Sequence, residues 1–120
     1  RMNHRMPPDG TLEEQFALRH PVRFVPGSVF ARLFGAEEVM TNTLHGQGIA
    51  RPGRAVVIEG TAPDGTPEAI RVQGAPGFTL SVQWHPEWNA EADPVSRALF
   101  RAFGEACGDW AAQGARRLSA

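Results

Sequence analysis

A tight-turn sequence between two β-prone runs sets the strongest limit on the architecture of this chain. The runs are residues 55–61 and 67–72, and Pro63-Asp64-Gly65 lies between them. Because glycine readily adopts the positive φ that hairpin turns demand, Asp-Gly at this position predicts a β-hairpin. A third run, residues 78–84, alternates apolar and polar side chains, which indicates a further strand with Phe78 and Trp84 on its apolar face.

A long amphipathic helix is predicted near the end of the sequence. Asp93 is a suitable N-cap, and Pro94 suits the first helical position. The apolar residues recur at steps of three and four and form one stripe: Val95, Leu99, Ala102, Phe103, Ala106 and Trp110. Such a stripe must cover a sheet, and the strands of this sequence supply only part of one. We therefore expect part of a larger domain, with a self-sufficient small α+β domain as the alternative.

The beginning of the sequence is less regular. Residues 1–19 are predicted to be loop or irregular structure. A strand is expected over residues 20–25, followed by a short helix that Ser28 caps and Gly35 ends. Residues 38–42 are predicted to form a short strand that leads into a loop.

A histidine and a glutamate follow the third β-run in His85-Pro86-Glu87. Pro86 has no amide donor and biases the residue before it toward extended geometry, so the strand is expected to end here. In an extended backbone, His85 and Glu87 point to the same side, with their roots about 6–7 Å apart. A carboxylate can then accept one imidazole N–H while the other ring nitrogen serves a nucleophile. The alternative is a solvated pair behind a strand that stops at a proline.

The sequence around this pair resembles the catalytic segment of class I glutamine amidotransferases. The resemblance rests on residues 81–89, and the Trp-His-Pro-Glu-Trp-Asn string within them is most similar to the gamma-glutamyl-gamma-aminobutyrate hydrolases of putrescine degradation. Three further segments follow in the order of that family, at residues 42–48, 62–70 and 96–100. The resemblance covers most of the chain, from about residue 20 to residue 107.

This resemblance implies an α/β fold: residues 1–120 would be the C-terminal portion of one flavodoxin-like amidotransferase domain, with a β-hairpin and a C-terminal covering helix. It implies that His85 is the general base and that Glu87 fixes its tautomer. The implied reaction is attack of a thiol on the δ-carbonyl of a gamma-glutamyl amide, with a thioester intermediate hydrolysed to glutamate and amine. The resemblance implies no metal and no other cofactor.

The nucleophile of such an enzyme is absent from this sequence. A nucleophile elbow has glycine on both sides of the reactive residue, and no Gly-x-Cys-x-Gly occurs. Cys107, the only cysteine, is expected to be a partly buried helical thiol and not the nucleophile, because the end of a helix does not favour a reactive thiolate. Since the chain starts at Arg1, we expect the thiol on an N-terminal half that forms a separate segment or chain, with a truncated gene product as the alternative. The chain alone is expected to be inactive.

Several other residues are predicted to act outside the catalytic pair. His45 and Gln47 lie in a glycine-bracketed loop whose family counterpart approaches the catalytic pocket, so they are predicted to bind substrate; a solvated loop is the alternative. Glu68 and Arg71 are predicted to be surface charges, and Trp88 a packing residue. No metal site is predicted, because the spacing of a zinc site is absent from the histidines of the chain, His4, His20, His45 and His85.

Composition excludes several partners. A formal net charge of -1 over 120 residues argues against nucleic acid or an anionic membrane. No apolar run approaches the roughly 20 residues of a membrane helix. The single cysteine and the lack of a leader fit a cytoplasmic protein. A homodimer stays open, as do two other functions: the glutaminase part of an amidotransferase that gives ammonia to a synthetase, and a non-catalytic module.

Overall fold

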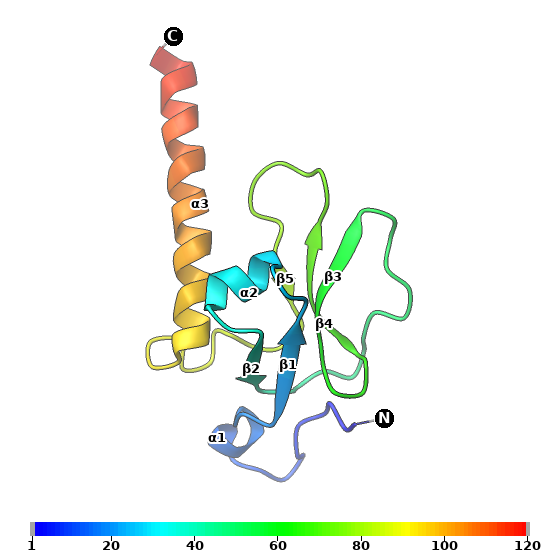
Figure 1. Ribbon diagram of the computed structural model, residues 1–120. Helices are drawn as coiled ribbons and strands as arrows, with labels where there is room; N and C mark the ends of the chain where they lie inside the picture. The colour runs from blue at the N-terminus through cyan, green and yellow to red at the C-terminus, as the bar shows by residue number, and fades with distance from the viewer. Residues whose placement is uncertain (1, 120) are drawn as a thin grey trace.

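The computed structural model describes residues 2–119 and shows a mixed α/β fold built on one sheet (Figure 1). The sheet has the strand order β2-β1-β3-β4-β5, and all neighbouring strands are antiparallel. The strands are β1 (His20–Phe24), β2 (Glu38–Thr41), β3 (Val56–Thr61), β4 (Pro67–Val72) and β5 (Ser81–Val82). The helices are α1 (Leu12–Gln15), α2 (Val29–Phe34) and α3 (Pro94–Ser119). The predicted fold class, with its hairpin and C-terminal helix, is confirmed.

The predicted hairpin joins β3 to β4. Gly65 has a φ of 85°, and its N–H donates to the carbonyl of Ala62 over 2.9 Å. The side chain of Asp64 accepts the amide N–H of Thr66 over 3.1 Å, which closes the turn.

Two consecutive register shifts interrupt the hairpin and turn two glutamates into the protein. The Cα partners on either side of the shifts are Ile58–Ile70, Gly60–Ala69 and Thr61–Pro67. Glu59 on β3 and Glu68 on β4 are therefore the extra residues, and both are buried. Because a β-bulge redirects a side chain, these shifts explain why the prediction of Glu68 as a surface charge is wrong.

Glu59 attaches α2 to the sheet. Its carboxylate accepts the amide N–H of Phe30 over 3.1 Å and forms an ion pair with Arg71, which is therefore not a free surface charge. The predicted caps of α2 are confirmed. The hydroxyl of Ser28 accepts the N–H of Ala31 over 3.2 Å, and Gly35 ends the helix with a φ of 64°.

The core lies between the sheet and the helices α2 and α3. Its buried members are Val22, Phe24, Phe30, Ala31, Val39, Ala69, Trp84 and Leu99. The rings of Phe24 and Phe30 stack with centroids 5.7 Å apart, which fixes α2 against β1.

The third predicted strand is much shorter than expected. Phe78 and Trp84 lie on the core side as their alternation predicted, but only Ser81–Val82 pairs as a strand. The reason lies at Thr79, whose hydroxyl forms the hydrogen bonds that the backbone of a longer β5 would form. It accepts the N–H of Val72 over 3.2 Å and donates to the carbonyl of the same residue over 3.3 Å. A side chain therefore satisfies groups that a longer β5 would have paired.

Helix α3 begins as predicted. The carboxylate of Asp93 accepts the amide N–H of Ser96 over 3.2 Å and its hydroxyl over 2.6 Å. Leu99 is buried in the core and Val95 packs against it. This first part of the helix packs against α2 and closes the core that lies on the sheet.

The outer part of α3 extends beyond the strands (Figure 1). Along it, the side chains of Phe103 and Trp110 are 50% and 71% exposed. Cys107 lies on the same part and is exposed, so the expectation of a partly buried thiol is wrong. The helix also continues past Gly114 to Ser119. Within residues 2–119, no helix combines the length and the apolar character needed to span a bilayer.

Replacing Gly60 by alanine tests the close packing beside the bulge. A Cβ at this position would lie 2.8 Å from the ring of Phe24 and 3.0 Å from the Cβ of Ala69. We expect Gly60→Ala to destabilise the fold by about 1–3 kcal/mol through overpacking. Urea unfolding measures the change. Gly108→Ala in α3 is the matched control, because its Cβ meets no atom within 4 Å and alanine favours a helix. Equal unfolding midpoints for Gly60→Ala and the unchanged protein would contradict this account.

Candidate active site

The side chains of His85 and Glu87 are in contact. His85 Nδ1 lies 2.6 Å from Glu87 Oε1, so the imidazole donates its Nδ1–H to the carboxylate. Any chemistry at this ring then falls to Nε2, which carries the lone pair. The side chains are 41% and 60% exposed, respectively, so the pair lies at the surface of the chain. The spacing of the motif correctly predicted this contact; the catalytic roles stay predictions.

A buried asparagine holds the backbone of His85. The side-chain carbonyl of Asn42 accepts the N–H of His85 over 2.8 Å, and its amide donates to the carbonyl of His85 over 3.0 Å. Asn42 directly follows β2 and is 5% exposed. Because both main-chain groups of His85 are bound, the root of the imidazole has a fixed position. Sequence reasoning assigned no role to Asn42, since the contact spans 43 residues.

A cavity of about 370 Å³ lies beside the pair. Its lining includes Phe16, Met40, Asn42, Trp84, His85 and Trp88. Trp88 stacks on Phe16 with ring centroids 4.5 Å apart, so it is a packing residue, as predicted. The ring of Phe16 also meets His85 edge-on at 5.7 Å. The volume falls in the range of small-molecule sites, and the aromatic wall offers an apolar contact surface.

The predicted substrate residues, His45 and Gln47, line a different cavity. This second cavity has a volume of about 490 Å³ and lies between the N-terminal segment and the turn of the hairpin. His45 Nδ1 is 2.7 Å from the carbonyl of Gln47, and His45 is not a solvated loop residue because its side chain is only 9% exposed. The structure does not bring these two residues into the wall of the cavity beside His85, and their role in substrate binding stays a prediction.

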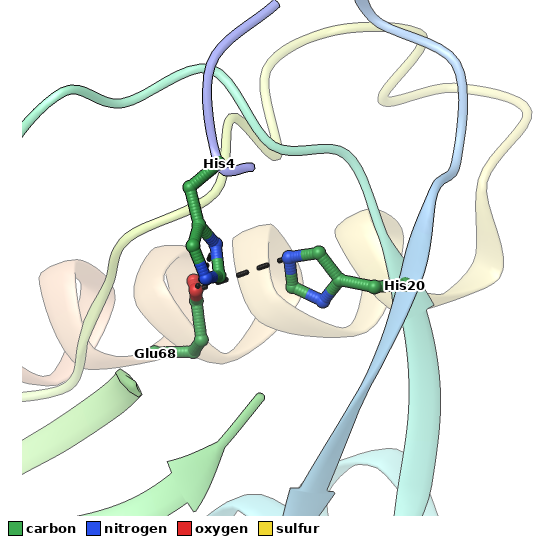
Figure 2. Close-up of side chains that lie close together, drawn as sticks. All are labelled: His4, His20 and Glu68. Atoms are coloured by element: carbon green, nitrogen blue, oxygen red, sulfur yellow. Dashed lines mark ion pairs between the residues drawn. The ribbon is translucent and has the colours of Figure 1, made fainter. Parts of the chain in front are cut away.

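Three of the four histidines gather around the buried carboxylate of Glu68, and Figure 2 shows two of them, His4 and His20. Glu68 Oε1 lies 3.3 Å from His4 Nδ1, 3.3 Å from His45 Nε2 and 3.9 Å from His20 Nε2. His4 comes from the N-terminal segment, His20 from β1 and His45 from the loop after β2. The sequence spacing indicated no such grouping, because the bulge that turns Glu68 inward has no local signal.

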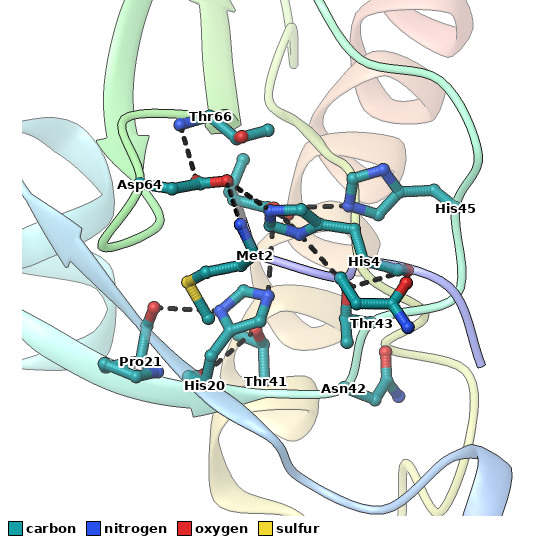
Figure 3. Close-up of polar contacts among 12 residues, drawn as sticks. Met2, His4, His20, Pro21, Thr41, Asn42, Thr43, His45, Asp64 and Thr66 are labelled. Carbon is teal, nitrogen blue, oxygen red and sulfur yellow. Dashed lines mark hydrogen bonds and ion pairs between the residues drawn. The ribbon is translucent and has the colours of Figure 1, made fainter. Parts of the chain in front are cut away.

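Two carboxylates of this region have opposite pKa shifts. Burial raises the pKa of Glu68 even though the surrounding imidazoles favour its charged form. At Asp64 burial also acts to raise the pKa, but hydrogen bonds from His4 and Thr66 outweigh it and hold the pKa well below its usual range. Figure 3 shows the contacts, among them His4 Nε2 at 3.0 Å from Asp64 Oδ2. Asp64 is therefore an ionised acceptor that fixes the ring of His4.

Comparison with known proteins identifies relatives of this chain. The sequence model of the family described as Peptidase C26 matches residues 1–87. The chain is 38% identical over 107 residues to the gamma-glutamyl-gamma-aminobutyrate hydrolase of Escherichia coli strain K12, with 88% of this chain and 42% of that protein covered. The corresponding hydrolase of Shigella flexneri is 38% identical over 103 residues, covering 85% of this chain and 40% of the relative.

A more distant similarity joins the chain to a CTP synthase. The CTP synthase of Rubrobacter xylanophilus is 34% identical over 95 residues, covering 73% of this chain and 17% of that enzyme. The chain spans about two fifths of the length of the hydrolases it matches, 42% and 40% in the two cases. The family match includes His85 and Glu87 and covers well over half of the sequence. This chain therefore belongs to the Peptidase C26 family, whose members are class I glutamine amidotransferase-like proteins.

Proposed function

We propose that this chain supplies the histidine and the carboxylate of a Cys-His-Glu hydrolase that cleaves gamma-glutamyl amide bonds. The observation that carries the proposal is the 2.6 Å contact between His85 and Glu87 on a backbone that Asn42 clamps. A base held in one tautomer and one position is what thiol activation requires. The name of the E. coli relative supports the gamma-glutamyl substrate class.

In this reaction Nε2 of His85 acts first as a base that accepts a proton and then as an acid that donates it. Nε2 takes the proton of the thiol, and the thiolate attacks the δ-carbonyl carbon of the gamma-glutamyl amide. As the C–N bond breaks, the imidazolium returns the proton to the leaving amine, and a thioester remains. Water then gives Nε2 a proton as it attacks the thioester. Glutamate leaves and the thiol regains its proton. Glu87 stabilises the imidazolium in each half of the cycle.

The thiol has to come from polypeptide outside this chain. Cys107 lies in α3, about 20 Å along the helix axis from Pro94 at a rise of 1.5 Å per residue. It is exposed there and has no glycine-bracketed turn around it.

The similarity to a CTP synthase supports a second candidate function. In that case the same pair would release ammonia from glutamine for a synthetase. The two functions separate in one assay of the protein encoded by the complete gene. Hydrolysis of gamma-glutamyl-aminobutyrate without any partner favours the first. Glutaminase activity that needs a synthetase favours the second. Intact mass spectrometry that finds only a species of this chain's mass, with no activity, favours a non-catalytic module.

His85→Ala is expected to lower the turnover of gamma-glutamyl amides by about 10²–10⁴-fold, the usual contribution of a general acid–base group. Glu87→Gln keeps the size of the side chain and is expected to cause a smaller loss, mainly in kcat. Release of glutamate measures both. Glu91→Gln, an exposed carboxylate beyond the motif, is the control and should behave as the unchanged enzyme. Full turnover in His85→Ala would refute the assigned role.

Asn42→Ala tests Asn42 as a positioning residue. The variant leaves the partly buried N–H and carbonyl of His85 without their partners, so we expect a loss of about 1–3 kcal/mol in unfolding free energy. Because the imidazole loses its fixed root, kcat should fall while KM for the gamma-glutamyl amide changes little. Asn3→Ala removes an exposed local hydrogen bond and is the matched control. A change in stability without any change in kcat would show that Asn42 has only a structural role.

A further inference from the structure

With neutral histidines, the cluster formed by His4, His20, His45 and Glu68 has fewer hydrogen-bond donors than acceptors. Each histidine has one ring nitrogen that faces an oxygen outside the cluster. These contacts are His4 Nε2 to Asp64 Oδ2 at 3.0 Å, His20 Nδ1 to the carbonyl of Pro21 at 3.0 Å, and His45 Nδ1 to the carbonyl of Gln47 at 2.7 Å. Carboxylate and carbonyl oxygens only accept hydrogen bonds, so the proton of each neutral imidazole lies on that outer nitrogen.

The inner nitrogens of the three rings consequently present lone pairs to Glu68. The hydroxyl of Thr43 lies 2.9 Å from the carbonyl of His4 and 3.2 Å from His4 Nδ1, and its single proton serves only one of these acceptors. Among residues 2–119, Glu68 Oε2 and His20 Nε2 are buried and have no hydrogen-bond partner. The side chains of Glu68 and His20 are 0% and 2% exposed. Four basic atoms converge on one small volume, and a cation is the species that would satisfy them.

The spacing of these atoms is close to that of the ligands of a tetrahedral metal ion but wider at His20. With bonds of about 2.0–2.2 Å, a zinc ion holds its ligand atoms about 3.3–3.6 Å apart. Two of the three nitrogen-to-oxygen distances are 3.3 Å, and the third, at His20, is 3.9 Å. The candidate ligand atoms of His4, His20 and Glu68 all lie within 4.8 Å of one another. The His20 ring would have to move inward to complete the set, and His45 joins the set through its contact with Glu68.

We propose that His4 Nδ1, His20 Nε2, His45 Nε2 and Glu68 Oε1 bind one Zn²⁺ ion. Four protein ligands leave no open position, so the site is structural and takes no part in the hydrolysis. Asp64 accepts the outer N–H of His4, the usual way in which a carboxylate orients a metal-bound imidazole. The two carboxylates balance the charge of the ion. The proposal is independent of the proposed function, because none of the four ligands belongs to the His85–Glu87 pair.

The ion would join four segments that are far apart in the sequence. His4 belongs to the N-terminal segment, His20 to β1, His45 to the loop after β2 and Glu68 to β4. The loop that carries His45 begins at Asn42, which clamps His85. The metal would therefore order the segment on which the position of His85 depends.

Metal analysis of the protein encoded by the complete gene, purified without a histidine tag, tests this proposal. We expect about one zinc per chain by elemental mass spectrometry. After stripping with a chelator, CoCl₂ should produce the visible absorption of tetrahedral Co²⁺, and ZnCl₂ should raise Tm. Glu68→Gln and His4→Gln should abolish stoichiometric binding, and Asp64→Asn should weaken it by about 10- to 100-fold. His85→Ala, which removes a histidine outside the cluster, should bind as the unchanged protein.

Two results would overturn the proposal. One is a stripped protein that binds neither Co²⁺ nor Zn²⁺ and keeps its Tm, which would identify the cluster as a hydrogen-bond network held by shared protons. The other is undiminished zinc affinity in both ligand variants, which would place the ion elsewhere. If Glu68→Gln does not fold, His4→Gln decides, because its residue lies in the N-terminal segment outside the sheet.

Discussion

The paired bulges of the β3–β4 hairpin organise the whole chain. In a regular ladder every second side chain faces the core. A glutamate at such a position is unfavourable, because burying its charge costs free energy unless the charge is paired. The two register shifts place Glu59 and Glu68 inside instead. Glu59 then binds the first turn of α2, and Glu68 gathers three histidines from three other segments. Two carboxylates from neighbouring strands thus attach α2, the N-terminal segment and the loop after β2 to the sheet.

Local sequence signals predicted the parts of the fold that local chemistry decides. Asp-Gly located the hairpin, Ser28 and Gly35 delimited α2, and Asp93 began α3. The spacing of His85 and Glu87 also predicted their contact, because it depends on two residues in an extended stretch. Each of these features needs only a few adjacent residues.

Features that depend on distant partners escaped sequence reasoning. The strand over residues 78–84 shrank to two residues because the hydroxyl of Thr79 took the backbone groups of Val72. Glu68 was predicted to lie at the surface because the alternation of side chains along a strand does not reveal a β-bulge. The histidine cluster and the clamp of Asn42 on His85 join residues that are tens of positions apart, and no spacing rule reports such contacts.

The outer part of α3 has a consequence for the dynamics of the chain. Gly104 and Gly108 lower its intrinsic helix propensity, and an added Cβ at either would meet nothing within 4 Å. Trp110 contributes little burial there. Its backbone amides should therefore exchange with solvent deuterium far faster than those near Leu99. Protection would rise only when another surface packs on it, so exchange along this one helix reports how complete the assembled protein is.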